Sequence, residues 1–157
     1  METKKFLIDR YGNWDDLTDE CKVSTFLIKL DQKIHEAKDM LIERYNYIIN
    51  QNPASAKFMY ENNIMLGYDG KNIESAMKHG TLAVGQLGLA ETLRILIGKD
   101  QTTEEGMQLA KRIEQLFKDR CAEFKKEYKL NFRRILHTSR KFMLYSNEEI
   151  PKEIWQN

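Results

Sequence analysis

A run of apolar residues between positions 23 and 48 constrains the fold more than any other feature of the sequence. The run advances in steps of three and four, which keeps its members on one face of a helix. It consists of Val23, Leu27, Leu30, Ile34, Ala37, Leu41, Tyr45 and Ile48. We expect a helix over about residues 19–50, with Asp19 as its N-cap and its end before Pro53, which disfavours helix at Asn52. Such an amphipathic helix needs an apolar partner surface.

A second helix of the same kind is predicted near the C-terminal end of the sequence. Thr102 and Glu105 have the spacing of a capping box, and the helix should end near Lys129. Its apolar face again advances by three and four: Ala110, Ile113, Phe117, Cys121, Phe124 and Tyr128. Beyond it, residues 131–157 show no sustained period.

The segment between the two helices gives weaker signals. Residues 57–60 fit either a short strand or a turn of helix, and residues 72–78 fit a short helix. A further helix should run through Leu93 and Leu96 to Gly98, a residue suited to a left-handed cap. We therefore expect a mainly α-helical chain.

Composition narrows the class of protein. With 157 residues, 41% hydrophobic and 31% charged, the chain has the balance of one globular domain or part of one. A net charge of +1 gives no general attraction to nucleic acid or to an acidic membrane. The N-terminal residues carry early acids and no long apolar core, so a signal peptide is not expected, and neither is a membrane span. We expect a cytoplasmic protein.

The segment HGTLAVGQLGLAE, residues 79–91, is the least ordinary part of the sequence because three of the eight glycines fall within it. It is not a phosphate loop, since no Lys-Ser/Thr pair follows the glycines. It is not a dinucleotide fingerprint either, because GQLGLAE lacks the preceding strand and the required spacing. From the residues alone, close packing at a helix start is favoured over a ligand site.

Other chemistry-bearing residues do not converge on a site. The three histidines, His35, His79 and His137, lack metal-ligand spacing with one another and with the two cysteines. Cys21 and Cys121 are far apart and are expected to be buried or half-buried thiols. The carboxylates lie on solvated helix faces, and the basic tail lacks the aromatic pattern of an RNA-binding surface. We expect no metal site, no catalytic pair and no nucleic-acid partner.

Residues 78–99, KHGTLAVGQLGLAETLRILIGK, resemble a segment of the anaerobic ribonucleoside-triphosphate reductases, the glycyl-radical (class III) ribonucleotide reductases. The similarity extends over roughly residues 20–132, through LDQKIHEAKDMLIERY and FKKEYKLNF. It implies that the long helices correspond to outer helices of a ten-stranded α/β barrel, with most of the barrel strands missing. It also implies that part of the glycine segment lies near substrate: His79, Gly80, Thr81, Gly85 and Gly88.

The resemblance also implies an activity, the reduction of ribonucleoside triphosphates to deoxyribonucleoside triphosphates for DNA synthesis, and the cofactors and partners that this activity needs. Members carry a glycyl radical, a catalytic barrel-loop cysteine, a four-cysteine zinc site and ATP or dNTP effectors; they form homodimers activated by a radical-SAM enzyme. The present sequence has neither the radical-glycine motif nor a cysteine cluster, and Cys21 and Cys121 do not match the barrel-loop cysteine. No catalytic residue and no cofactor of its own is therefore assigned to this chain.

Three parts of the chain are expected: a lead-in over 1–18, the reductase-like segment over 19–132, and a tail over 133–157. The tail can be back-translated so that the frame one nucleotide later reads GVYYTPAENLCYTAMKKFQKKFGK, which resembles the continuation of the family. This suggests a frameshift near Phe132. The favoured hypothesis is an inactive reductase fragment whose exposed apolar stripes cause self-association. The alternatives are a helical interaction protein, with intact reductase as one partner, and a small phosphate-binding enzyme.

Overall fold

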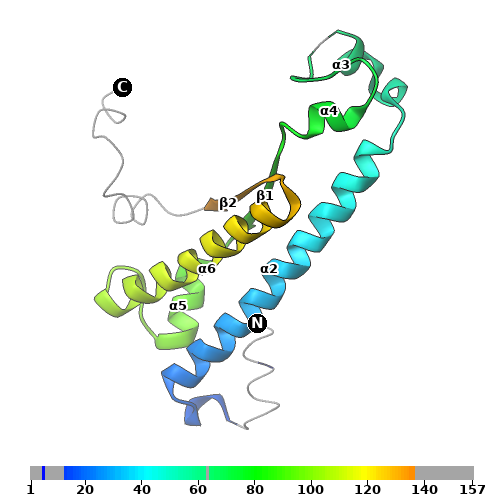
Figure 1. Cartoon of the computed structure of the whole chain (residues 1–157). Coiled ribbons are helices and arrows are strands. Elements are labelled where there is room, and N and C mark those ends of the chain that lie inside the picture. The colour runs from blue at the N-terminus through cyan, green and yellow to red at the C-terminus, as the bar shows by residue number, and fades with distance from the viewer. Residues whose placement is uncertain (1–4, 6–12, 63, 137–157) are drawn as a thin grey trace, which may run out of the picture.

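The computed structural model describes residue 5 and residues 13–62 and 64–136, and within them the chain is mainly helical (Figure 1). The expected fold class is therefore confirmed. The predicted lead-in before residue 13 and the tail from residue 137, with His137, lie outside the described residues. The elements, in chain order, are η1 (Trp14–Asp16), α2 (Asp19–Ile49), η2 (Pro53–Ala56), α3 (Lys57–Glu61), α4 (Ile73–Met77), β1 (Thr81–Gln86), α5 (Leu89–Ile97), α6 (Glu104–Tyr128) and β2 (Asn131–Leu136).

The two long helices begin and end close to the predicted positions, but both N-caps differ by one residue from the prediction. In α2 the cap is Thr18, whose hydroxyl accepts a hydrogen bond from the Cys21 amide, so the assignment of Asp19 was wrong. In α6 the cap is Thr103, which accepts from the Gly106 amide. A threonine hydroxyl at the N-cap satisfies one of the four unpaired amides of a first helical turn.

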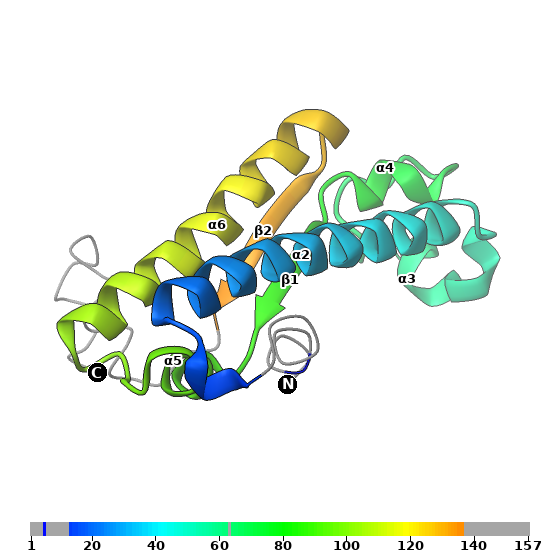
Figure 2. The same ribbon diagram turned by 90° about the horizontal axis from the view of Figure 1, so that it is seen from below.

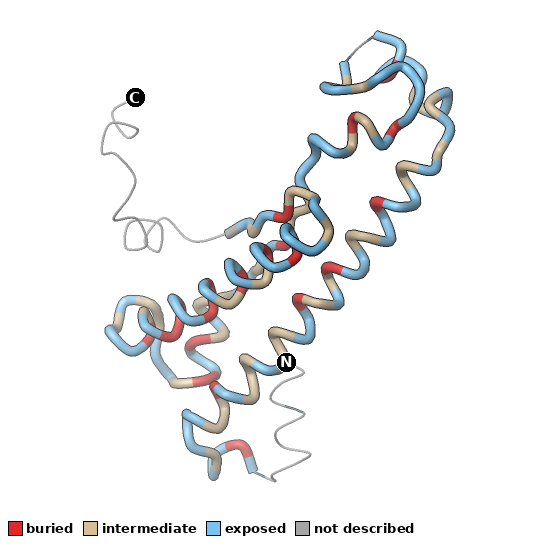
Figure 3. Tube along the Cα trace, viewed as in Figure 1, coloured by how far each residue is buried: buried red, intermediate tan, exposed pale blue. Residues whose placement is uncertain are grey.

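The core forms where the apolar stripes of α2 and α6 meet the strands (Figures 1 and 2). Ile34 of α2 and Phe124 of α6 are each 2% exposed, and Phe132 of β2 packs edge-on to Phe124. Figure 3 shows buried positions recurring along both helices. In the described chain the residues of both stripes are buried or half-buried, contrary to the expectation that the stripes would be exposed. Self-association stays a prediction.

The two strands were not predicted, and the expectation that no strand precedes GQLGLAE was wrong, because β1 leads directly into it. They form a parallel pair in which Thr81 lies opposite Asn131 and Gln86 opposite Leu136, and α5 and α6 connect them. Parallel strands require such a crossover. Among the described residues this is a two-stranded sheet, and its β2 strand extends four residues into the segment that the sequence assigned to the tail.

One face of this sheet is covered and the other is open. Val84 and Phe132 are buried in the core, whereas Gly85, Arg133 and Ile135, on the opposite face, are exposed. Ile135 is 55% exposed. Parallel sheets are normally covered on both faces, so the open face is unusual for a complete parallel sheet.

A second, smaller apolar cluster lies at the far end of α2, around Tyr60, Ile73 and Ala76 (Figure 1). Residues 57–60, which fitted a strand or a helix, belong to the helix α3, and the predicted short helix is α4. None of the helices described is long and apolar enough to span a bilayer.

Candidate functional site

The carboxyl ends of the two strands form one candidate site, since ligands of open α/β sheets bind at this edge. β1 ends at Gln86, and α5 begins at Leu89 after a turn at Gly88. Gly88 has φ 78°, a left-handed conformation that glycine adopts without steric cost. Backbone conformation rather than close packing therefore explains the glycine at this helix start.

The start of α5 has features that both favour and oppose an anion. The unpaired amides of a first helical turn attract negative charge. However, Glu91 already lies in that turn, and its Oε2 would be 3.7 Å from a Cβ added at Gly88. A phosphate at this position would have to displace that carboxylate. The turn therefore does not by itself identify a phosphate site.

The other predicted site residues lie at the amino end of β1. Thr81 accepts a hydrogen bond of 2.7 Å from the Asn131 side-chain amide, which ties together the starts of both strands. The exposed His79 ring lies against Gly67, where an added Cβ would be 2.3 Å from its Cδ2. Gly80 lies close to the Met77 backbone: a Cβ added at Gly80 would be 3.1 Å from the Met77 carbonyl oxygen.

The structure therefore separates the five predicted residues into two groups. Five residue steps separate Thr81 from Gln86, or about 17 Å at a strand rise of roughly 3.3 Å per residue. His79, Gly80 and Thr81 lie at one end of the strand, and Gly85 and Gly88 lie at the other. A single small ligand would contact one group or the other, and their proximity to substrate stays a prediction.

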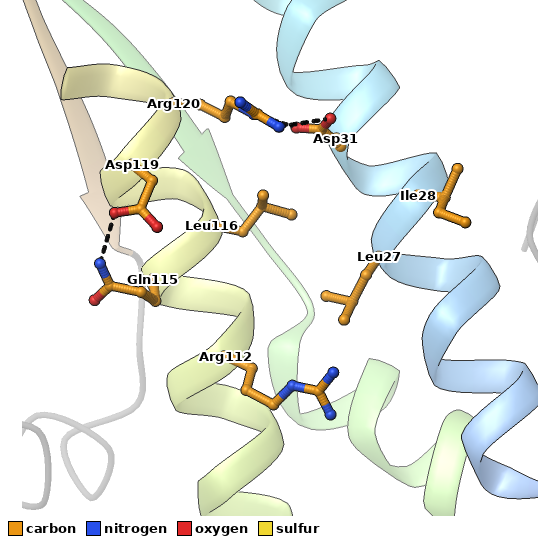
Figure 4. A pocket seen from close by; sticks show the side chains of 8 residues that line it. All are labelled: Leu27, Ile28, Asp31, Arg112, Gln115, Leu116, Asp119 and Arg120. Atoms are coloured by element: carbon orange, nitrogen blue, oxygen red, sulfur yellow. Dashed lines mark hydrogen bonds and ion pairs between the residues drawn. The ribbon is translucent and has the colours of Figure 1, made fainter. Parts of the chain in front are cut away.

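A groove between α2 and α6 was not predicted from the sequence (Figure 4). Its volume is about 390 Å³, and its lining residues are Leu27, Ile28, Asp31, Arg112, Gln115, Leu116, Asp119 and Arg120. Figure 4 shows Leu27 and Leu116 projecting into the space between the helices and Arg112 reaching across it.

A bidentate ion pair closes one end of this groove. Arg120 donates from Nε and Nη2 to the two carboxylate oxygens of Asp31, at 2.5 and 3.1 Å, and also binds Glu123. Hydrogen bonds first to Asp31 and then to Glu123 raise the pKa of Arg120 above its ordinary value. Arg120 therefore fixes α2 against α6 and remains charged at every working pH.

A lysine in the contact between the same helices serves a similar structural purpose. Lys38 is 9% exposed, binds Asp39, and donates to the Tyr128 hydroxyl at 3.2 Å. Its ammonium also lies 5.7 Å from the centroid of the Phe124 ring. The hydrogen bonds to Asp39 and then Tyr128 raise the pKa of Lys38 despite the opposing effect of burial. The group is held in its charged form and is not prepared for acid–base chemistry near neutral pH.

A buried carboxylate beneath the sheet was also not predicted from the sequence. Glu114 of α6 has an 11% exposed side chain and accepts a 2.7 Å hydrogen bond from Arg134 of β2. Its second oxygen, Oε1, is buried and finds no partner among the described residues. The sequence placed Glu114 on a solvated face because the charge that neutralises it lies 20 residues away.

The cysteines do not fit the zinc site that the resemblance implies. The sequence contains two cysteines, fewer than the four required. Cys121 is buried on α6, where burial raises the pKa of its thiol, and Cys21 is half-buried on α2. Within the described ranges no three His, Cys, Asp or Glu side chains form a group that could hold a metal ion.

Comparison with known proteins gives one finding. The sequence pattern of a family described as anaerobic ribonucleoside-triphosphate reductase matches residues 16–137, which is most of the 157-residue chain. The match includes α2, both strands and α6. No curated protein matches the chain. The chain belongs to the anaerobic ribonucleoside-triphosphate reductase family.

Proposed function

We propose that this chain is a segment of the catalytic domain of an anaerobic ribonucleoside-triphosphate reductase and does not reduce ribonucleotides alone. In this proposal α2 and α6 are outer helices, and β1 and β2 are two neighbouring strands of a larger barrel. The observation that carries it is the sheet: two parallel strands, covered by helices on one face and open on the other. Further strands and a second covering layer would complete such a sheet.

The chemical groups of the reaction would then come from other parts of the enzyme. With two cysteines and no fitting cluster, these residues cannot supply a four-thiolate zinc site. We assign the glycyl radical, the zinc and the nucleotide effector sites to portions of the enzyme outside this sequence. A homodimeric enzyme and a radical-SAM activase are the partners that the family resemblance favours, in the cytoplasm.

The substrate-facing part of this segment would be the carboxyl edge of the strands. Gly85 and Gly88 lie at this edge, as does the start of α5, while His79 lies at the opposite end. Catalytic groups of α/β barrels gather at the carboxyl ends of the strands. This geometry favours Gly85 and Gly88 over His79, Gly80 and Thr81 as neighbours of substrate.

A segment exchange tests the proposal directly. Residues 16–136 would replace the matching segment of an active member of the family, and anaerobic reduction of a ribonucleoside triphosphate would be measured after radical activation. We expect activity in the chimera, none in the isolated chain, and a larger loss from Gly85→Val than from His79→Ala. A folded chimera without activity, or turnover by the isolated chain, would contradict the proposal.

The frameshift remains a separate proposal about residues 133–157. Strand β2 and the family match extend to residues 136 and 137, so the first residues of this segment are compatible with the fold. Sequencing the gene tests it: the nucleotides after the Phe132 codon should encode GVYYTPAEN one base along. A gene that lacks this reading removes the hypothesis and leaves the family assignment unchanged.

A further inference from the structure

The groove between α2 and α6 has the form of a seam into which a further helix packs. On α6 its lining residues are at positions 112, 115, 116 and 119, which share one face of the helix and cover two turns. On α2 its lining residues are at positions 27, 28 and 31, again on one face. Seven residues at a rise of about 1.5 Å give a length of roughly 10 Å. Side chains of a third helix would insert between two such stripes, as ridges insert into grooves.

Apolar side chains from both helices line this seam. Leu27 and Leu116 are half-buried and project into the space between the helices (Figure 4). Ile28 lies on the same stripe of α2 as Leu27 and is 62% exposed. A single exposed isoleucine is ordinary on a protein surface. Here, however, Ile28 continues the apolar lining of a groove, and covering the three side chains together would remove apolar surface from water.

The charges of the seam differ in whether they already have partners. Arg120 and Asp31 form the bidentate pair described above, so neither is available to an occupant. In contrast, Arg112 reaches across the seam and has no hydrogen bond or ion pair with any described residue (Figure 4). Asp119, two turns along the same stripe, accepts a 2.6 Å hydrogen bond from the uncharged Gln115 amide. The seam therefore has a positive end and a negative end.

This pattern identifies the chemistry of an occupant. An amphipathic helix with an acidic residue and a basic residue two turns apart would pair the first with Arg112 and the second with Asp119. Its apolar residues between these charges would lie against the two leucines and Ile28. Recognition of a helix in a groove uses such regularly spaced anchors. Because ion pairs near water contribute little, the apolar contacts supply most of the affinity and the charges select the partner.

We propose that the groove binds an amphipathic helix of this composition from a part of the reductase outside this sequence. The proposal rests on the proposed function, in which α2 and α6 are outer helices of a larger catalytic domain. A segment separated from its domain exposes the surfaces that its missing neighbours cover, as Ile28 is exposed here. This surface differs from the open sheet face around Gly85 and Ile135, which further layers of the barrel would cover.

Two synthetic helical peptides test the chemistry of the groove on the full chain. One carries leucines between a glutamate and a lysine two turns apart (the Glu–Lys probe), and in the other a second lysine replaces the glutamate (the Lys–Lys probe). Fluorescence anisotropy should show about tenfold tighter binding of the Glu–Lys probe. Arg112→Glu should reverse this preference. Lys118→Glu, which makes the same charge change at an exposed residue outside the groove lining, should leave the preference unchanged.

A matched pair of apolar variants tests the contact with Ile28. Ile28→Gln should weaken binding of both probes about fivefold, because it removes apolar surface from the groove. Tyr47 lies on the same helix and is 68% exposed, but it is outside the groove lining, so Tyr47→Gln should have no effect. Circular dichroism of each variant separates loss of binding from loss of fold.

Chemical labelling tests whether the covering helix comes from the parent enzyme. In a Cys21→Ser background, the reaction of Ile28→Cys and Lys118→Cys with a maleimide would be measured by mass spectrometry of the peptides that contain them. The isolated chain and the segment-exchange chimera would be compared. The thiol at position 28 should react at least about tenfold more slowly in the chimera, because the helix covers it there, whereas the thiol at position 118 should react equally in both.

Three outcomes would overturn the proposal: equal binding of the two probes, an unchanged preference in Arg112→Glu, or equal labelling of position 28 in both proteins. An active chimera with any of these outcomes leaves the proposed function intact. A folded chimera without activity contradicts the proposed function, and the probes, measured on the isolated chain, still decide the chemistry of the groove.

Discussion

The ion pair between Glu114 and Arg134 permits a quantitative test of the fold. Arg134→Met would remove the hydrogen-bond partner of the Glu114 carboxylate, whose side chain is only 11% exposed. The other oxygen of this carboxylate, Oε1, already has no partner among the described residues. Breaking a fully buried pair costs about 3–5 kcal/mol. Because the Arg134 side chain is 30% exposed, water can partly replace it, and we expect a loss of about 2 kcal/mol in the free energy of unfolding.

Urea denaturation followed by circular dichroism measures this loss. With a slope of about 1.5 kcal/mol per molar urea, the midpoint should fall by about 1.3 M. Replacing both residues with methionine removes the stranded charge and should recover most of the stability. Arg133→Met, on the exposed face of the same strand, is the matched control and should change stability by less than about 0.5 kcal/mol. Equal effects of Arg133→Met and Arg134→Met would refute the reasoning.

Three further perturbations follow from the core and its supports. Phe124→Ala should lower the free energy of unfolding by about 3–5 kcal/mol, whereas Phe58→Ala, at a side chain 72% exposed, should have little effect in the same urea assay. Gly106→Ala should lower the thermal midpoint markedly, since its Cβ would lie 1.9 Å from the Asp100 carbonyl oxygen; an unchanged midpoint would contradict this contact. The raised pKa of Lys38 stabilises the fold below the unfolded lysine pKa, and this contribution is lost as pH rises through the folded value. Unfolding measured from pH 9 to 12 should therefore show a decline that is smaller in Lys38→Met.

The long helices could be predicted because their signal is local. Apolar residues that recur every three or four positions identify α2 and α6 without knowledge of the partner, and Gly98 ends α5 in the expected left-handed conformation. Cap positions were less certain because adjacent residues offer equivalent side chains. Thr102 and Thr103 are both capable N-caps, and only the backbone conformation selects Thr103.

The strands were missed because their signals depend on distant partners. Thr81 pairs with Asn131, 50 residues away, and the small residues of β1 show no clear alternation. In β2, Arg134 occupies an inward position that a sequence pattern assigns to an apolar residue. Its charge is tolerated because Glu114 lies beneath it, a contact that no local rule predicts.

The candidate site was predicted only in part. The glycine segment was correctly singled out, but the sequence could not show that its two ends lie at opposite ends of a strand. The groove between α2 and α6 was not predicted, because it depends on which side of α6 packs against α2.

The length of α2 has a consequence for how the chain opens. Its 31 residues contact the main core over most of the helix and the cluster around Tyr60 and Ile73 near its end. Contiguous units with few shared contacts open at different free energies and exchange their amide hydrogens at different rates. Amides of α3 and α4 should therefore exchange with deuterium well before those at the centre of α6. One continuous helix would then contain two levels of protection, divided near the point where its contacts pass from one cluster to the other.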